Sequence, residues 1–295
     1  MVHNKQGIDM LHGRIWTKVL RFALPVAATG ILEQLFNASG IMIVGNFSQS
    51  DGTAAVAAVG SNAPVTGLIL NLFIGIALGA NVVIANAIGR GSREAVRNAV
   101  HTSIVTALIG GVIVAIIGEL LAGPLLGMLN VTADVFPLAL AYLRIYLIGM
   151  PVILLYNFET AIFRSIGDTQ APLAVLAISG VLNVTMGLIF VVLFHWGVSG
   201  VATATVIANV VSSMILLYRL VHTDAAIHVD LREFGIDWFT LRQILRIGLP
   251  AGVQSAVFAV ANIIIQAAIN SLGTVVIAAS SAAFNIEILA YDVLN

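Results

Sequence analysis

The sequence "LRFALP" at residues 20–25 recurs, with two substitutions, as "LRIGLP" at residues 245–250. At the same offset, Asn37 coincides with Asn262, and matching polar residues are harder to explain by chance than matching Leu or Ala. An internal repeat of this kind is typical of membrane transporters built from two similar halves. We therefore predict that the chain contains one complete unit and the beginning of a second copy.

The composition excludes a soluble enzyme. Of the 295 residues, 59% are hydrophobic and only 9% are charged, whereas about a quarter are charged in an average soluble domain. The chain has no cysteine, which excludes disulfides, thiolate metal sites and cysteine nucleophiles. We expect a lipid bilayer around the protein, no cofactor, no enzymatic activity and no nucleic-acid partner.

Eight apolar segments are long enough to cross a membrane as helices, which takes roughly 20 residues each. The eight lie near residues 19–45, 54–88, 98–120, 134–162, 171–194, 200–220, 243–268 and 275 to the end. Pro64 interrupts the second segment. We still interpret that segment as one long helix, because splitting it would destroy the alternation of charge described next.

Twelve of the 13 Lys and Arg residues fall on the same side of the predicted membrane. The positive-inside rule makes that side cytoplasmic, and it places the N-terminus there, in a plasma (inner) membrane. Arg144 is the exception, about ten residues into the fourth span. Its side chain either extends to the outer interface beside Tyr142 and Tyr146 or pairs with a carboxylate inside the membrane.

Six predicted spans separate the two copies of the repeat, so the copies have the same orientation. We predict an all-α membrane protein with a six-helix N-terminal lobe at residues 1–220. Residues 221–242 form a cytoplasmic linker, which we interpret as an amphipathic helix at the membrane surface. Residues 243–295 begin a C-terminal lobe. A second lobe as long as the first would end near residue 450, so we expect a fragment that acts with the missing lobe as a monomer.

Several motifs resemble the multidrug and toxic compound extrusion (MATE) family. They are "LPVAATGILEQLFNASGIMIVGNF", "AAVGSNAP", "AIFRSIGDTQAPL", "LNVTMGLIFVVLFHWGVSGVATATVIA" and "LRIGLPAGVQSAVFAVANIIIQAAINSLG". The resemblance runs along the whole chain. It implies twelve helices in two lobes, and export of cationic or amphipathic compounds in exchange for sodium ions or protons.

Carboxylates inside predicted spans are candidates for coupling, because an ionisable group in lipid is costly. Glu33 and Asn37 share one helical face, and Glu33 either lines a cavity or bonds to a neighbouring helix. Glu159 lies five residues from Arg164, so it is either a coupling group or a surface charge. Glu287 lies near the middle of the eighth span.

The chain departs from the family at two positions. Many members have an aspartate where this chain has Gly40, and another where it has Gly187. The resemblance implies that Asn183 and Thr205 supply oxygen ligands to a sodium ion. Without the two aspartates these oxygens would bind Na⁺ weakly, and coupling would move to Glu33, Glu159 or Glu287, or be lost.

Gly167 and Asp168 suit a tight turn before the fifth span, which acts either as structure or as a gating hinge. Pro25 and Pro250 occupy matching places in the two repeats and are further gating candidates. The resemblance implies secondary multidrug efflux by alternating access between two lobes. The alternatives are a lipid-linked precursor flippase of the same broader fold and a non-functional remnant of a transporter.

Overall fold

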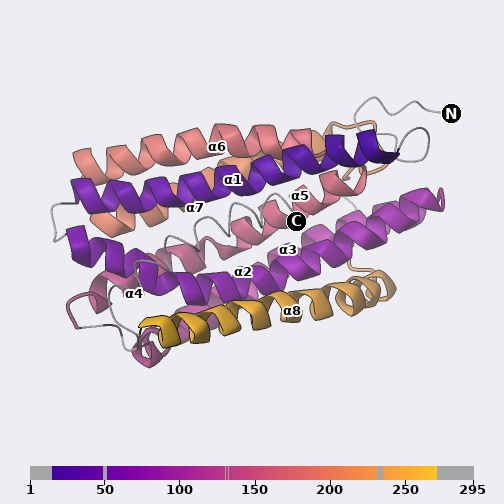
Figure 1. Cartoon of the computed structure of the whole chain (residues 1–295). Coiled ribbons are helices and arrows are strands. Elements are labelled where there is room, and N and C mark those ends of the chain that lie inside the picture. The colour runs from indigo at the N-terminus through magenta and orange to yellow at the C-terminus, as the bar shows by residue number, and fades with distance from the viewer. Residues whose placement is uncertain (1–14, 49–51, 130, 132, 231–234, 271–295) are drawn as a thin grey trace.

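The protein is a bundle of long helices in a computed structural model that describes residues 15–48, 52–129, 131, 133–230 and 235–270. Side chains of residues 15, 128 and 262–270 are outside this description. The elements are α1 (Ile15–Phe47), α2 (Gly52–Gly89), α3 (Arg93–Met128), α4 (Phe136–Ile148), α5 (Met150–Ser165), α6 (Gln170–Leu188), the π-helical turn η1 (Ile189–Leu193), α7 (Gly197–Val221) and α8 (Trp238–Asn270). Figure 1 shows α1, α6 and α7 along one side of the bundle and α2, α3 and α8 along the other.

Six of these helices are long and apolar enough to cross a membrane, and the bent pair of α4 and α5 forms a seventh candidate span. The described residues contain no strand. The prediction of an all-α membrane bundle is confirmed. α2 is a single helix that contains Pro64, as the charge pattern requires. The eighth predicted span lies outside the described residues.

The fourth predicted span is broken. Where the sequence predicts one helix over residues 134–162, α4 and α5 meet at an angle of 53°. Pro151 is the second residue of α5, a position that a proline tolerates because its missing N–H would be unpaired there anyway. Gly149 lies at the break, where an added Cβ would be 2.5 Å from a methyl group of Val206. The bend therefore lets α7 pack tightly against the junction.

Buried apolar side chains form two clusters, one toward each end of the bundle. One cluster includes Leu143 and Leu154, and the other includes Ile84 and Phe158. On α7, the residues between Val201 of the first cluster and Ile215, which packs against the second, belong to neither. A polar cavity at this middle level is therefore possible without loss of either core.

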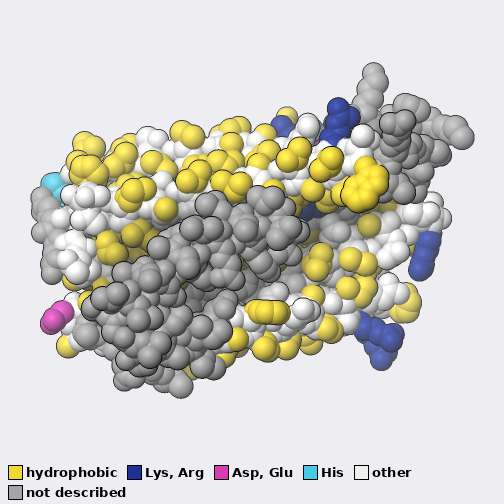
Figure 2. All heavy atoms as spheres, viewed as in Figure 1, with side chains coloured by type: hydrophobic (Ala, Val, Ile, Leu, Met, Phe, Trp, Pro, Cys, Tyr) yellow, Lys and Arg dark blue, Asp and Glu magenta, His cyan; other side chains and the backbone are white. Residues whose placement is uncertain are grey.

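Basic side chains gather at the end of the bundle where α1 begins and α2 ends, which we call the basic end. On the face shown in Figure 2, Lys and Arg lie at this end, and hydrophobic side chains cover the length of the helices. Exposed apolar side chains include Leu120 and Leu193, at 75% and 70%. Such a surface is suited to lipid contact.

The linker differs from the prediction. Its described residues before α8 are not helical, so the expected amphipathic helix is wrong. Ala225, Ile227 and Val229 are buried while the residues between them are exposed, which is the period of an extended chain. The amide of Asp230 donates to His101 Nε2 at 3.2 Å, and that of Asp237 donates to Thr102 Oγ1 at 3.1 Å. The linker is thereby attached to α3.

Candidate functional site

A cavity of about 170 Å³ opens between α1, α2, α4, α5, α6 and α7. It lies at the middle level between the two apolar clusters. Its polar lining residues are Glu33, Asn37, Tyr146, Tyr156, Asn157, Ser179, Asn183, Thr205, Asn209 and Ser212. The cavity thus brings together four candidates that the sequence predicted, namely Glu33, Asn37, Asn183 and Thr205.

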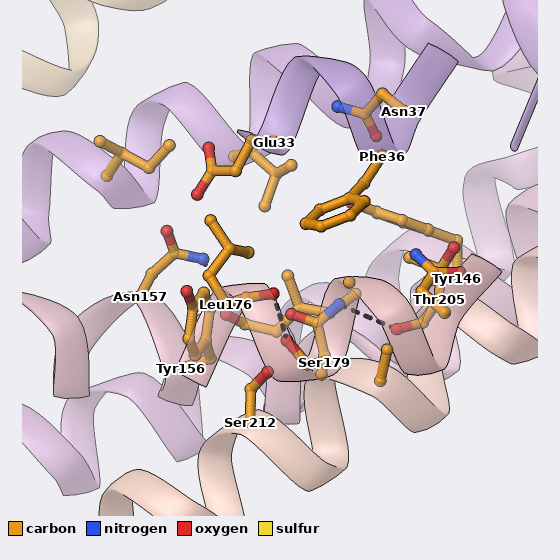
Figure 3. Close-up of a pocket in the computed structure, with 17 residues that line it drawn as sticks. Glu33, Phe36, Asn37, Tyr146, Tyr156, Asn157, Leu176, Ser179, Thr205 and Ser212 are labelled. Atoms are coloured by element: carbon orange, nitrogen blue, oxygen red, sulfur yellow. Dashed lines mark hydrogen bonds between the residues drawn. The ribbon is translucent and has the colours of Figure 1, made fainter. Parts of the chain in front are cut away.

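The wall formed by α1 carries the charge of the cavity. Glu33 and Asn37 are one turn apart, and both side chains are exposed to the cavity rather than packed in a core. In Figure 3, Glu33 points from α1 toward Asn157 and Tyr156 on α5. Its carboxylate interacts electrostatically with Tyr156 and with Arg164 near the end of α5. Among the lining residues described, Glu33 alone is charged.

The opposite walls present oxygen atoms. The side-chain amides of Asn157 and Asn209 donate to the carbonyls of Ile153 and Thr205, four residues earlier, at 2.8 and 2.9 Å. The Thr205 hydroxyl likewise donates to the carbonyl of Val201 at 3.0 Å. Because these donors bond to their own helices, their oxygens remain available as acceptors. The cavity is therefore suited to a cation or to a ligand rich in hydrogen-bond donors.

Phe36 adds an aromatic face to the wall formed by α1. An added Cβ at Gly180 of α6 would lie 1.8 Å from Phe36 Cε2, so the ring occupies the groove that this glycine leaves on α6. Tyr146 stacks on Tyr142 with ring centroids 6.1 Å apart. Aromatic faces beside a carboxylate favour organic cations.

The two glycines that the resemblance places at family aspartate positions, Gly40 and Gly187, are packed by aliphatic groups. An added Cβ at Gly40 would lie 3.2 Å from Val201 Cγ1, and one at Gly187 would lie 3.4 Å from Ile43 Cδ1. Neither glycine lines the cavity. A carboxylate at position 40 would have to displace the methyl group of Val201.

Glu159 is fully buried in α5 and does not line the cavity. The interpretation as a surface charge is therefore wrong. Neither carboxylate oxygen makes a hydrogen bond of normal geometry, although the Ser213 hydroxyl of α7 lies close by. The Tyr156 hydroxyl and Thr160 Oγ1 on the same helix are also buried and make no hydrogen bond of normal geometry, although they lie close to each other. Tyr156 lines the cavity, so this polar group adjoins it.

The turn before α6 has the expected local geometry. Gly167 has a φ of +78°, a left-handed conformation that favours glycine. Asp168 Oδ1 accepts hydrogen bonds from the amides of Gln170 and Ala171 at 3.1 and 3.0 Å. These contacts stabilise the start of α6, as the structural interpretation of the turn predicts, and the gating interpretation stays a prediction.

The remaining candidates are placed as follows. Pro25 and Pro250 lie inside α1 and α8, respectively, and neither lines the cavity. Asn262 lies in α8, but its side chain is outside the described residues, as is all of Glu287. The structure thus gives no position for these two polar side chains of the second copy.

Arg144 follows neither of its two predicted alternatives fully. Its Nε lies 3.0 Å from Glu119 Oε1 of α3, so it does pair with a carboxylate. The pair is on the surface, however, with side chains 52% and 38% exposed. Neither residue lines the cavity.

Sequence reasoning missed several lining residues. Asn209 and Ser212 follow Thr205 at i+4 and i+7, and Ser179 precedes Asn183 by four. This spacing puts polar groups on one face of each helix, and it could have identified both stripes. Across the described part of the chain, no group of three or more His, Asp or Glu could hold a metal ion.

Residues 25–189 match the MatE family. The chain belongs to the MatE family. It is 25% identical over 272 residues to the probable multidrug resistance protein YpnP of Bacillus subtilis strain 168, a match that covers 91% of this chain and 59% of YpnP. It is 26% identical over 289 residues to the probable multidrug resistance protein NorM of Thermotoga maritima, covering 93% of this chain and 59% of NorM.

The fold is similar to solved MATE structures. The crystal structure of MATE in the bent conformation superposes with a TM-score of 0.89 and 27% identity, over 98% of this chain and 64% of that one. These MatE relatives are transporters, and the chain spans about three fifths of the length of those it matches. The protein is a multi-pass membrane protein of a multidrug efflux family.

Proposed function

We propose that the protein exports cationic or amphipathic small molecules across the plasma (inner) membrane in exchange for a proton or Na⁺. The N-terminus is cytoplasmic, and transport proceeds by alternating access between two lobes, with the protein acting as a monomer. One observation carries the proposal: the cavity combines a single carboxylate, Glu33, with acceptor oxygens on the facing helices. Membership of a multidrug efflux family supports it.

Binding follows from the chemistry of the cavity. Glu33 supplies the counter-charge for a cationic group, and Asn37, Asn157 and Asn209 accept hydrogen bonds from it. The rings of Phe36 and Tyr146 contact its apolar part. Because the cavity is partly shielded from water, each of these contacts is stronger than it would be in bulk solvent.

Coupling requires a second cation that competes for the same negative charge. A buried carboxylate without a partner is costly unless a cation neutralises it, and Glu159 is such a group. Tyr156 interacts electrostatically with both Glu33 and Glu159, so it links the cavity to the buried group. Binding of a proton or Na⁺ at either carboxylate would weaken the hold on a cationic substrate. Asn183 and Thr205 would contribute oxygens if the ion is sodium.

The test is transport by the protein at its full coding length in inverted membrane vesicles, with a fluorescent organic cation as substrate. Glu33→Gln should abolish uptake into the vesicles and leave membrane insertion unchanged. The matched control is Glu94→Gln, which removes an exposed carboxylate in the first turn of α3. Wild-type rates in Glu33→Gln would reject Glu33 as the counter-charge.

Proton and sodium gradients are imposed separately in the same vesicles. Glu159→Gln should transport at a rate that no longer responds to the gradient that drives the wild type. If Glu159→Gln retains that response, coupling resides elsewhere.

The flippase alternative is disfavoured by charge. A lipid-linked precursor carries phosphates, and its cavity would need basic groups. The lining residues described here include no Lys or Arg. The remnant alternative predicts no transport by the wild type under either gradient.

A further inference from the structure

We propose that Arg144 and Glu119 form a binding site for the phosphate group of a phospholipid, on the outer surface of α3 and α4. The pair lies away from the cavity, so this site is separate from the proposed transport function. Its ligand is a phosphodiester anchored in the bilayer.

The surroundings of the pair are those of a surface that contacts lipid. Leu120, next to Glu119, is 75% exposed, and Ile148, one turn after Arg144, is 68% exposed. Ile116, one turn before Leu120, is 59% exposed. A charged pair among such side chains is expensive in hydrocarbon unless further polar groups reach it.

The length of α3 puts the pair near the boundary of the hydrocarbon core, within reach of lipid phosphates. α3 has 36 residues, which makes it about 54 Å long, roughly 24 Å longer than the hydrocarbon core of a bilayer. Glu119 lies nine residues before the end of α3, and Arg144 lies eight after the start of α4. Both are therefore about 12–14 Å from the helix ends. If α3 is centred in the bilayer, this depth is the boundary between hydrocarbon and headgroups.

The guanidinium of Arg144 has donors to spare. Its Nε is paired with Glu119 Oε1, and no hydrogen bond of its two Nη groups to another described residue is present. Glu119 Oε2 is buried and unpaired, so the carboxylate is held in the helix contact rather than turned outward. Packing of α4 against α3 holds this arrangement, because an added Cβ at Gly118 would lie only 2.6 Å from Leu147 Cδ2.

An arginine fork held in this way suits a phosphate, to which guanidinium donates two parallel hydrogen bonds. Because Glu119 cancels the charge of Arg144, the site has no net charge. It should therefore bind phosphatidylethanolamine and phosphatidylglycerol about equally, since both carry the phosphodiester. A diacyl glycolipid without phosphate should not bind.

Native mass spectrometry of the purified protein, titrated with each of these three lipids, measures the binding. Arg144→Gln should lose one tightly bound phospholipid, with affinity lowered roughly tenfold or more, as expected for a lost charge-assisted hydrogen bond. Arg144→Lys keeps the charge without the fork and should be intermediate. Arg90→Gln, in an exposed turn beyond α2, is the matched control and should bind as the wild type does.

Glu119→Gln gives an independent readout, because it leaves a net positive charge and should shift the preference toward phosphatidylglycerol. The proposal is overturned if Arg144→Gln binds phospholipid like the wild type, or if the glycolipid binds equally well. It is also overturned if inorganic phosphate at equal concentration displaces the lipid, which would show a site for a free anion. Should Arg144→Gln fail to fold, Arg144→Lys and Glu119→Gln decide the question.

Discussion

α2 and α8 cross in close backbone contact, and the crossing depends on four glycines. Gly75 faces Gly252, and Gly79 faces Gly248. An added Cβ at Gly75 would lie 2.1 Å from the Gly252 nitrogen, and one at Gly79 would lie 2.4 Å from the Ile244 carbonyl oxygen. Small residues that let backbones touch are a main source of helix association in membranes.

Gly75→Ala should separate the two helices. Ordinary contact begins at 3.4 Å, so the backbones would have to move apart by more than an ångström, because neither contact atom belongs to a flexible side chain. Overpacking of this kind costs about 1–3 kcal/mol. For a protein of this size, that corresponds to a fall in Tm of roughly 2–12 °C.

Gly67→Ala is the matched control on the same helix, since an added Cβ there meets no atom within 4 Å. Both variants gain the same helix propensity, about 0.5–1 kcal/mol, so the difference between them isolates the steric effect. The assay is thermal unfolding of the purified protein in detergent, followed by circular dichroism. Equal Tm values for the two variants would show that α2 and α8 are not in backbone contact.

Three further predictions use the same unfolding assay. Gly180→Ala should lower Tm because its methyl group needs the space of the Phe36 ring, and adding Phe36→Ala should restore part of the loss. Asp168→Ala should cost about 0.5–2 kcal/mol by removing the cap of α6, whereas Asp168→Asn should cost less. Hydrogen bonds from Thr240 lower the pKa of Asp237 below its usual 3.8, so ionised Asp237 stabilises the fold above about pH 3.8, and this stability is lost as the pH falls through the lowered pKa. Thr240→Val should raise the pKa of Asp237. Acid titration of the variant should then show this stability being lost at a higher pH.

The seven spans within the described residues could be predicted because they depend on hydrophobic length, which is a property of the chain alone; their direction, taken from the placement of Lys and Arg, stays a prediction. The break at Gly149 could not be predicted as securely. Pro151 is compatible either with a straight helix start or with a bend, and the approach of Val206 on α7 decides between them. Such a contact is visible only after the helices are packed.

The linker shows a different limit. The composition of the linker resembles that of an interfacial helix, and the helix prediction rests on that composition. The spacing of its apolar residues, however, is the period of an extended chain. Ala225, Ile227 and Val229 alternate with polar or exposed residues. The period was present in the sequence and would have predicted the structure. The same holds for the polar stripe of Thr205, Asn209 and Ser212, which needs only helical spacing to be found.

Burial of Glu159 could not be derived from the sequence, because it depends on which face of α5 the neighbouring helices cover. The prediction that Gly40 and Gly187 replace family aspartates rests on the resemblance, and the structure adds what surrounds these two glycines. Aliphatic contacts of Val201 and Ile43 close the space beside Gly40 and Gly187. The carboxylate of the cavity is Glu33, seven residues before Gly40 and thus about 10 Å nearer the basic end. A cation held by Glu33 would therefore lie closer to Asn157 and Tyr156 than to Gly40 and Gly187. Substitutions of Asn157 should accordingly weaken substrate binding more than equivalent changes beside Gly187.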